Sequence, residues 1–469
     1  RYRPERDSAE WGKGVKPDEF AGGHLEGIRR SLPELQELGI NVIYLTPIHR
    51  GVHCHRYDIV DAEVVDPLLG GEEAFVALLN DVHARGMRLL LDFSFSHVGR
   101  GFGPYEDVLV HGRSSRYASW FQWKGEDELR LYGKRDDAPL LDLNNEQVRE
   151  MVLSAARKWA QLGIDGFRLD AAAEFPRDLA RQVREQLKSH KPDAIVLGEL
   201  VPAHFWRWRG EGALDVATDF GYQNLATQFI AQRSIDALEA SKCLLAIELR
   251  RGTRSTLGMR FLSTHDHPRF ASVARLHQDE SRGALGFVFL MTSAGVPSLL
   301  YGEEYGVASD VVELLPENAW EDRVCLDWVG AERKTHLRGL VGRLCVMRKQ
   351  SRALREGSQE VVYAEGGLLV FRRSAGGEVV DVAINASDES VEVELEDDEF
   401  DGLEPWVRVG AVQVQGQRVI LGANAGVVAA RRMSLARLGA RRIQIEANRR
   451  CQRDAFRDSA IAAQVRPLR

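Results

Sequence analysis

Four apolar runs of this chain each carry an acidic side chain where a buried β-strand would end. The runs are LLLDFSFSH (89–97), GIDGFRLDAA (163–172), VLGEL (196–200) and FLSTHDHPR (261–269). The acids are Asp92, Asp170, Glu199 and Asp266. Cleavage of a glycosidic bond with retention needs two carboxyl groups about 5–5.5 Å apart, one as nucleophile and one as proton donor. Acids that converge at one end of a sheet would therefore predict glycosidase chemistry.

The surroundings of three of these acids suggest a role for each. Arg168 and Asp170 are two residues apart on an expected strand, so their side chains point to the same face. A guanidinium group lowers the pKa of a neighbouring carboxyl, which suits Asp170 as a nucleophile that stays ionised. Glu199 follows Gly198 and an apolar run, where burial and nearby negative charge would keep its proton. Asp266 would favour the positive charge that develops at the anomeric carbon.

Seven further side chains are candidate substrate contacts. They are Tyr57, Asp58, Asp92, His97, Arg168, His265 and Arg269. We expect the two histidines to bond to sugar hydroxyls and the Tyr57 ring to lie against the sugar. Taken singly, each has a structural interpretation, such as a salt bridge at a strand end. Their joint occurrence in chain order, each after a β-type run, favours the functional interpretation.

A helix, a glycine and a short apolar strand recur between residues 24 and 350. The helix-and-glycine segments 24–39, 72–86 and 148–163 precede the strand segments 41–48, 87–95 and 164–171, and further strands are expected at 194–200, 213–220, 259–266 and 296–301. Glycine is the usual left-handed residue after a helix. Strands that are apolar throughout indicate a parallel sheet covered by helices. In a barrel of such units, the C-terminal strand ends meet at one mouth.

Seven strands are one fewer than a (β/α)8 barrel requires. The chain begins with Arg1, and its first 20 residues are charged and interrupted by Pro and Gly, so we expect no buried strand there. The predicted fold class is therefore α/β: a TIM (β/α)8 barrel that lacks its first strand through N-terminal truncation, with an inserted lobe and a C-terminal antiparallel β domain.

The expected division of the chain has four parts. Residues 1–97 and 141–355 would form the barrel, 98–140 an inserted lobe, 356–430 the β domain and 431–469 a solvated Arg-rich tail. Alternation at 359–365, 368–373, 378–385 and 389–396 indicates antiparallel strands. The aromatic stretch YASWFQW (117–123) is favoured as the core of the lobe over a sugar platform, and Glu303 and Glu304 as structural residues of the barrel rim.

Composition excludes several classes of partner. A net charge of −7 over 469 residues gives no reason to expect nucleic acid or a membrane as partner, and the apolar runs are too short to cross a bilayer. The five cysteines form no CxxC pair; reduced thiols favour a cytoplasmic location. We expect no cofactor, and the oligomeric state stays open.

The ordered motifs resemble the α-amylase family, glycoside hydrolase family 13, over roughly residues 1–430. The family's nucleophile motif, Gly-x-Arg-x-Asp, matches Gly166, Arg168 and Asp170, and its first block, Asp-x4-His, matches Asp92 and His97. The resemblance implies that Glu199 is the acid/base and Asp266 the transition-state stabiliser. HDHPR (265–269) and the stretch 205–215 are most similar to the neopullulanase, cyclomaltodextrinase and maltogenic amylase branch.

Two departures from the family pattern qualify what the resemblance implies. The family usually has Asn, often a calcium ligand, just before the His of its first block, whereas this chain has Ser96. We therefore predict no metal. After the acid/base the branch commonly has Trp-His, whereas Leu200 and Val201 follow Glu199. This leaves hydrolysis and transfer open.

The leading hypothesis is a retaining enzyme that hydrolyses α-1,4-linked glucans such as maltooligosaccharides, cyclodextrins or starch-like chains. A second hypothesis makes transfer dominant, as in a glucanotransferase or a disaccharide isomerase of the same family. A third is a truncated homologue without activity, because a barrel with an open edge exposes unpaired backbone groups. The expected partner in the first two cases is an oligo- or polysaccharide.

Overall fold

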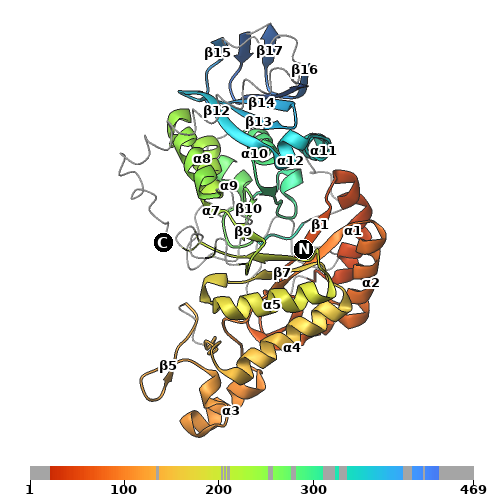
Figure 1. Ribbon diagram of the computed structural model, residues 1–469, viewed down its shortest axis with the longest axis vertical. Helices are drawn as coiled ribbons and strands as arrows, with labels where there is room; N and C mark the ends of the chain where they lie inside the picture. Colours follow the sequence, from red (N-terminus) through yellow and green to blue (C-terminus); the bar gives the residue numbers. More distant parts are fainter. Residues whose placement is uncertain are drawn as a thin grey trace.

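The computed structural model describes residues 22–133, 137–201, 204, 208, 212–251, 257–275, 281–309, 323–326, 335–394, 404–415 and 418–432. Residues 1–21 and the expected tail from residue 433 onward lie outside these ranges. In Figure 1 the described chain is elongated, with a parallel sheet in the middle. An antiparallel β region lies at one end and a small lobe around α3 and β5 at the other.

Seven parallel strands, paired in chain order, form the central sheet. They are β1 (Val42–Leu45), β4 (Arg88–Phe93), β7 (Gly166–Leu169), β8 (Ile195–Gly198), β9 (Val216–Thr218), β10 (Leu257–Arg260) and β11 (Val296–Pro297). This confirms the predicted barrel-type sheet. Six strands lie within their expected segments, whereas β10 begins two residues early and ends at Arg260.

The early end of β10 has a local cause. Beyond Arg260, side chains and not a neighbouring strand accept backbone N–H groups. Ser263 Oγ accepts the Phe270 N–H over 2.9 Å, and Thr264 Oγ1 accepts the Asp266 N–H over 3.1 Å. Such side-chain to backbone bonds compete with regular strand pairing. Asp266 therefore lies on a loop after β10 and not at the strand end that the apolar run predicted.

Helices precede and follow the sheet strands along the chain. They are α1 (Leu25–Leu38), α2 (Gly71–Ala84), α4 (Glu146–Leu162), α5 (Arg177–His190), α7 (Phe220–Ala226), continued by the π-helix η5 (Thr227–Gln232), α8 (Ala237–Arg251), α9 (Phe270–Arg275), α10 (Ser281–Thr292), α11 (Thr335–Gln350) and α12 (Arg352–Glu356). Gly39 and Gly163 follow α1 and α4 with φ of 95° and 92°, the left-handed end that the sequence predicted.

The sheet has two edges within the described residues, at β1 and at β11. A closed eight-stranded barrel places one further strand between these two edges. The architecture is thus that of a TIM barrel lacking one strand among the described residues. The predicted cause, N-terminal truncation, stays a prediction because residues 1–21 lie outside those ranges.

Two insertions stand on the barrel. An antiparallel pair, β2 (His49–Gly51) with β3 (Ile59–Val65), follows β1 and leads to η1 (Pro67–Leu69). The lobe comprises α3 (Gly103–His111), η2 (Gly112–Ser114), η3 (Ala118–Trp120), β5 (Trp123–Lys124) and β6 (Glu128–Leu129). Phe121 is buried there against Tyr105, while Tyr117, Trp120 and Trp123 pack partly buried against the same core. The aromatic stretch therefore packs as the core of the lobe.

The C-terminal region is antiparallel, as the alternating segments predicted. One sheet has the order β12-β13-β14-β19-β16 and a second the order β15-β18-β17. Their bounds are β12 (Ser358–Glu365), β13 (Leu368–Ala375), β14 (Glu378–Asn385), β15 (Val391–Glu394), β16 (Glu404–Val409), β17 (Val412–Gln415), β18 (Arg418–Leu421) and β19 (Ala425–Arg432). The sequence prediction missed the last four. The boundaries of the four-part division stay a prediction.

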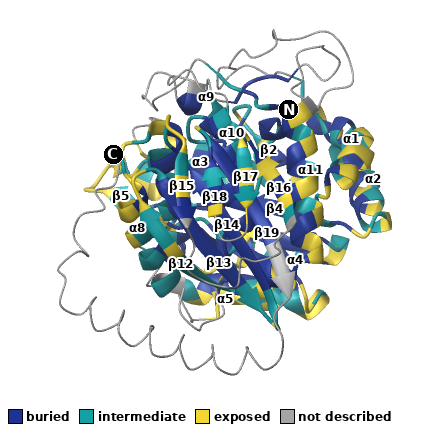
Figure 2. Cartoon of the chain, turned by 90° about the horizontal axis from the view of Figure 1, so that it is seen from above, coloured by how far each residue is buried: buried dark blue, intermediate teal, exposed yellow. Residues whose placement is uncertain are grey.

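Strand β13 shows why this region is stable. Leu369 and Phe371 join the core shared with α10 and α11, whereas Leu368 and Val370 join the core against the three-stranded sheet. Alternate residues face opposite sides of a strand, so both faces of β13 are covered. In Figure 2 this strand and β14 are accordingly dark blue.

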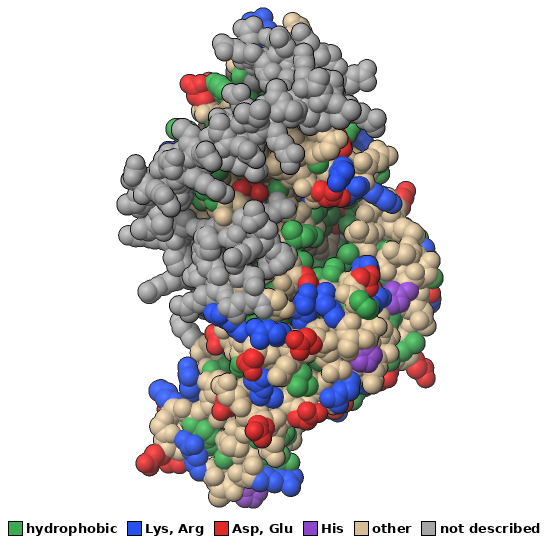
Figure 3. Space-filling model, in the orientation of Figure 1, with side chains coloured by type: hydrophobic (Ala, Val, Ile, Leu, Met, Phe, Trp, Pro, Cys, Tyr) green, Lys and Arg blue, Asp and Glu red, His purple; other side chains and the backbone are tan. Residues whose placement is uncertain are grey.

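The outer surface of the lower half mixes charges of both signs. In Figure 3, Lys and Arg side chains alternate with Asp and Glu over this face. The pair Arg149–Asp178 links α4 to α5, and Lys158 of α4 lies 3.0 Å from Glu72 of α2. Among the described residues, no helix combines the length and the apolar character needed to span a bilayer.

Candidate active site

Three neighbouring strands bring the first acids together. Asp92 of β4 lies opposite Arg168 of β7 in the register of the sheet. Asp170 directly follows β7, and Glu199 directly follows β8. Because these strands are parallel and adjacent, their C-terminal ends lie at the same edge, the position of active sites in barrels of this type.

One guanidinium group contacts all three of these carboxylates. Arg168 Nη1 lies 3.0 and 3.1 Å from the two oxygens of Asp92 and also donates to Asp170 Oδ1. Its Nη2 lies 3.0 Å from Glu199 Oε1. Arg168 is buried, and a buried charge is tolerated only when it is paired in this way. Arg168 therefore holds Asp170 and Glu199 on the same side of the site.

The second oxygen of each of these two acids is also held. Ser94 Oγ donates to Asp170 Oδ2 over 3.1 Å, and the Ala171 N–H donates to Glu199 Oε2 over 3.0 Å. Ala171 has a φ of 43°, a left-handed conformation that costs a residue with a Cβ about 1–2 kcal/mol. Strain of this kind concentrates at functional sites. The turn after Asp170 thus aims a backbone donor at Glu199.

Asp266 joins the other acids through a chain of polar contacts. His265 Nε2 lies 3.0 Å from Asp266 Oδ2 and 2.7 Å from the Tyr57 hydroxyl. That hydroxyl donates to Asp92 Oδ2 over 2.7 Å, and Asp92 is bonded to Arg168. The structure thus links Asp170, Glu199 and Asp266 in one network, with the Tyr57 and His265 rings parallel and 5.8 Å apart.

The pKa of Asp170 depends on its burial as well as on its neighbour Arg168. Burial raises the pKa of Asp170 to about 6; Arg168 opposes this shift, and the negative charges of Asp92 and Asp266 add to it. Arg168 lowers this pKa, as its position on the strand predicted, but the effect of burial is larger. The reason is that a buried carboxylate loses its hydration and shares its single cation with other acids.

The pKa of Asp266 is shifted in the opposite direction. Partial loss of hydration opposes the shift, but His265 and Arg323 hold the pKa of Asp266 well below its ordinary value, with a smaller contribution from Arg168. Arg323 Nη2 donates to Asp266 Oδ1 over 2.5 Å, and its Nε donates to the His265 carbonyl oxygen over 2.8 Å. The side chain of Asp266 is still 43 % exposed. It is therefore an ionised acid open to the solvent side of the site.

His97 is buried on the segment after β4. Its Nδ1 lies 2.9 Å from Ser96 Oγ, and its ring stacks on Tyr132 of the lobe at a centroid distance of 4.4 Å. Burial and the charges of Asp170, Glu199 and Asp266 raise the pKa of Tyr132, which places its hydroxyl in the field of all three acids. Ser96, the departure from the calcium-ligand pattern, therefore contacts His97.

Asp58 and Arg269, two further predicted substrate contacts, bond to backbone groups of the protein. Asp58 accepts the backbone N–H of His53, with 3.3 and 3.2 Å to its two oxygens. Arg269 has no exposed surface; its Nη1 donates to the Tyr301 carbonyl oxygen over 2.9 Å, and its guanidinium lies 4.8 Å from the centre of the Tyr301 ring. A side chain without exposed surface offers no contact to a sugar, so burial does not support the predicted role of Arg269.

The rim acids Glu303 and Glu304 are buried. Glu303 lies in η6 (Glu303–Tyr305) and accepts the Ser263 hydroxyl and, over 2.7 Å, the Leu300 N–H. Burial raises the pKa of Glu303 to about 7, while Ser263, Leu300 and Arg269 oppose the shift. Ser263 lies near the start of the loop that carries His265 and Asp266. Its hydrogen bond to Glu303 therefore anchors that loop.

Four residues of the site were missed by the sequence prediction. They are Tyr44, Ser94, Tyr132 and Arg323. Tyr44 donates to Asp92 Oδ2 over 2.6 Å from β1; Tyr44 and Ser94 lie in or just after strands that were predicted, so the strand-end argument could have found them. Tyr132 and Arg323 come from the lobe and from a distant loop, and no local sequence pattern marks either residue.

Two family models match this chain. Residues 5–135 and 123–334 match the model described as "Alpha amylase, catalytic domain". Residues 357–415 match the model described as "Alpha-amylase C-terminal domain".

Two curated relatives and one solved structure are similar to this chain over most of its length. The chain is 32 % identical over 401 residues to a cyclomaltodextrinase of Geobacillus thermopakistaniensis. The aligned residues cover 82 % of this chain and 66 % of that protein. It is 30 % identical over 361 residues to an intracellular maltogenic amylase of Bacillus subtilis, covering 74 % and 59 %. A cyclic α-maltosyl-(1→6)-maltose hydrolase of Arthrobacter globiformis superposes with a TM-score of 0.78 at 26 % identity, covering 91 % and 93 %.

The chain spans about two thirds or less of the length of these two curated relatives. Both are named for the branch that HDHPR and its neighbours predicted. The family match extends over all three acids. This chain therefore belongs to the α-amylase family.

Proposed function

We propose that this protein is a retaining glycoside hydrolase that acts on α-1,4-linked glucans, with Asp170, Glu199 and Asp266 as its catalytic acids. The observation that carries the proposal is the continuous network from Glu199 and Asp170 through Arg168 to Asp266. Relatives named cyclomaltodextrinase and maltogenic amylase support the choice of substrate: maltooligosaccharides, cyclodextrins or starch-like chains.

The first step forms a covalent intermediate. Asp170 Oδ attacks the anomeric carbon as the glycosidic bond breaks, and Glu199 gives its proton to the departing oxygen. Arg168 contacts both groups, so it holds the nucleophile and the acid at a constant distance from each other. Asp266 stabilises the positive charge on the sugar ring in the transition state.

The second step releases the product. Glu199, now ionised, removes a proton from a water molecule as that water attacks the anomeric carbon and frees Asp170. Tyr57, His97 and His265 bind the sugar beside the reacting carbon in this proposal. Asp92, whose side chain has no exposed surface, positions Tyr57 and Arg168, and Asp58 shapes the loop that carries Tyr57. Arg269 is proposed to anchor the Asp266 loop through Tyr301 instead of binding sugar.

Transfer to a sugar hydroxyl, as in a glucanotransferase or isomerase, is the second candidate. Val201, two residues after Glu199, is 50 % exposed, and an apolar side chain beside the acceptor side disfavours ordered water. Maltotriose digests separate the two candidates, because transfer yields oligomers longer than the substrate. Products no longer than maltotriose would support hydrolysis.

The catalytic assignment is tested with Asp170→Asn and Glu199→Gln. Each is expected to lose several orders of magnitude in turnover of maltotriose and cyclodextrin. Asp193→Asn is the matched control, because that acid pairs with Arg88 at the other end of β4 and is 60 % exposed. Full activity in both site variants would refute the assignment, and no activity in the parent chain would favour the non-catalytic hypothesis.

We further propose that the enzyme works in the cytoplasm on oligo- or polysaccharides, without nucleic acid or membrane partners. The relative of Bacillus subtilis is named intracellular. Cys325 and Cys345 carry free thiols, as expected in a reducing compartment. Cell fractionation with an antibody against the native protein tests the location.

A further inference from the structure

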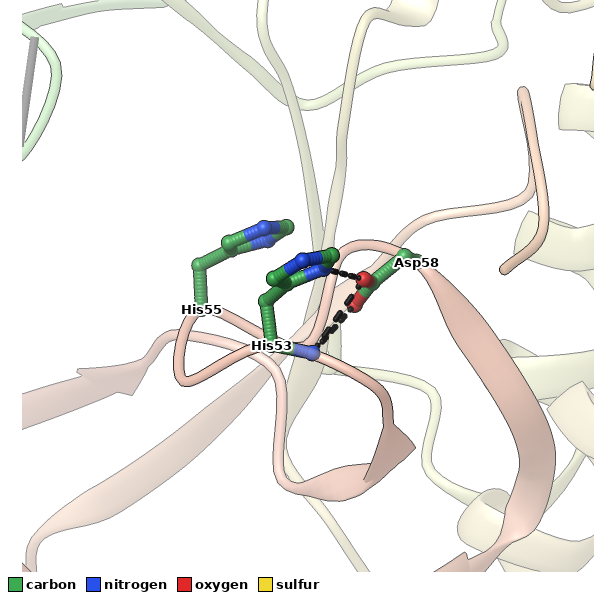
Figure 4. Close-up of side chains that lie close together, drawn as sticks. All are labelled: His53, His55 and Asp58. Carbon is green, nitrogen blue, oxygen red and sulfur yellow. Dashed lines mark hydrogen bonds and ion pairs between the residues drawn. The ribbon is translucent and has the colours of Figure 1, made fainter. Parts of the chain in front are cut away.

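His53, His55 and Asp58 form a cluster of nitrogen and oxygen donors on the loop between β2 and β3 (Figure 4). One potential ligand atom of each residue lies within 4.8 Å of the other two. Within the described ranges, this is the only group of three His, Cys, Asp or Glu donors that meets this criterion. The spacing His-x-His-x-x-Asp places all three donors on six consecutive residues.

The loop is already folded around these donors. Both the backbone N–H and Nδ1 of His53 contact the Asp58 carboxylate. His55 Nδ1 accepts the Tyr57 N–H over 3.1 Å. The two imidazole rings are parallel, with centroids 5.5 Å apart. In Figure 4 they lie next to each other on the same side of the loop, with the carboxylate at the edge of the His53 ring.

We propose that His53, His55 and Asp58 bind a divalent transition-metal ion of the Zn²⁺ class. Two imidazoles and one carboxylate are a donor set that Zn²⁺ prefers, and a water molecule completes a tetrahedral site. Ca²⁺ takes six to eight oxygen ligands, so this donor set selects against it. His55 and Asp58 are buried, whereas the side chain of His53 is 21 % exposed, which gives the ion a route from solvent.

Binding requires only a local change. The ion takes the place of the proton between His53 Nδ1 and Asp58, and His55 turns its ring about the Cβ–Cγ bond toward the ion. The backbone N–H of His53 keeps its contact with Asp58 throughout. The loop therefore stays closed while one ring moves.

The Tyr57 ring lies between the proposed metal site and His265, which contacts Asp266. The His55 ring is 5.9 Å from the Tyr57 ring, which is 5.8 Å from His265. Rotation of His55 therefore changes the packing behind Tyr57, and Zn²⁺ is expected to raise KM for glucan. This consequence rests on the proposed function, whereas the binding of metal does not.

The test is calorimetric titration of the tag-free, chelator-treated full chain with ZnCl₂. His53→Gln removes one ligand but keeps a side-chain N–H that can donate to Asp58. His111→Gln is the matched control, since His111 is an exposed histidine that pairs with Asp107 over 3.5 Å on α3. Circular dichroism establishes that each variant is folded, and Asp58→Asn is a second variant that removes the oxygen ligand.

The proposal predicts that His53→Gln binds one Zn²⁺ fewer than the parent, or binds that ion at least tenfold more weakly, while His111→Gln matches the parent. CaCl₂ should give no saturable heat at this site. Co²⁺ bound to the parent should show visible absorption that is lost in the His53 variant. Absence of Zn²⁺ binding by the parent, or equal binding by the parent and a folded His53→Gln, would overturn the proposal. A KM unaffected by bound Zn²⁺ would overturn only the coupling to the acid site.

Discussion

Replacing the proposed nucleophile should make the protein more stable at neutral pH. The pKa of Asp170 is about 6 in the folded chain against an ordinary value of 3.8, a difference equivalent to about 3 kcal/mol. Since the folded pKa is raised, the folded state binds this proton more tightly than the unfolded state. Folding stability is therefore lost as pH rises from about 4 to above 6. Asp170→Asn removes this cost while it abolishes attack on the sugar.

The assay is equilibrium urea denaturation of the parent and of Asp170→Asn. The variant should gain up to about 3 kcal/mol in free energy of unfolding at pH 7.5, and about half of that at pH 5, where the folded parent is mostly protonated. Asp165→Asn is the control: that buried acid pairs with His83 and Lys191, so its loss should destabilise. A loss of stability in Asp170→Asn at pH 7.5, or a gain that does not depend on pH, would refute the reasoning.

Three further predictions concern the same network. The kcat/KM for maltotriose should fall about tenfold per pH unit below about pH 6, because Asp170 attacks only when ionised; a flat profile from pH 7 to 5 would contradict this. Tyr44→Phe should cost about 1–3 kcal/mol of stability with little change in KM, whereas Tyr57→Phe should also raise KM; thermal denaturation and steady-state kinetics measure both. Ser263→Ala should lower kcat at least tenfold by loosening the loop of Asp266, and unchanged kcat would refute that anchor.

Much of the central sheet could be predicted because its signals are local. The sheet strands β1, β4, β7, β8 and β9 lie in the predicted apolar runs, which a helix-covered parallel sheet requires. Arg168 and Asp170 share a face because side chains alternate along a strand. Their contact therefore followed from spacing alone.

The parts that were missed depend on contacts between distant segments. Arg323 bonds to Asp266 across 57 residues, and Tyr132 reaches the acids from the lobe; no local pattern marks either residue. The net shift of the Asp170 pKa could not be predicted, because the sequence shows its cation but not its burial or the nearness of Asp266. The end of β10 was predicted too late in the chain, because the side chains of Ser263 and Thr264 accept backbone N–H groups where strand pairing was expected.

The most direct test of the central claim is capture of the covalent intermediate. Glu199→Gln is incubated with α-maltosyl fluoride, whose leaving group needs no acid, and the protein is digested and analysed by mass spectrometry. Because the variant lacks the base that activates water, a maltosyl ester is expected to accumulate on the peptide that contains Asp170. A maltosyl group on any other acid, or turnover of the fluoride by Asp170→Asn at the rate of the parent, would contradict the account.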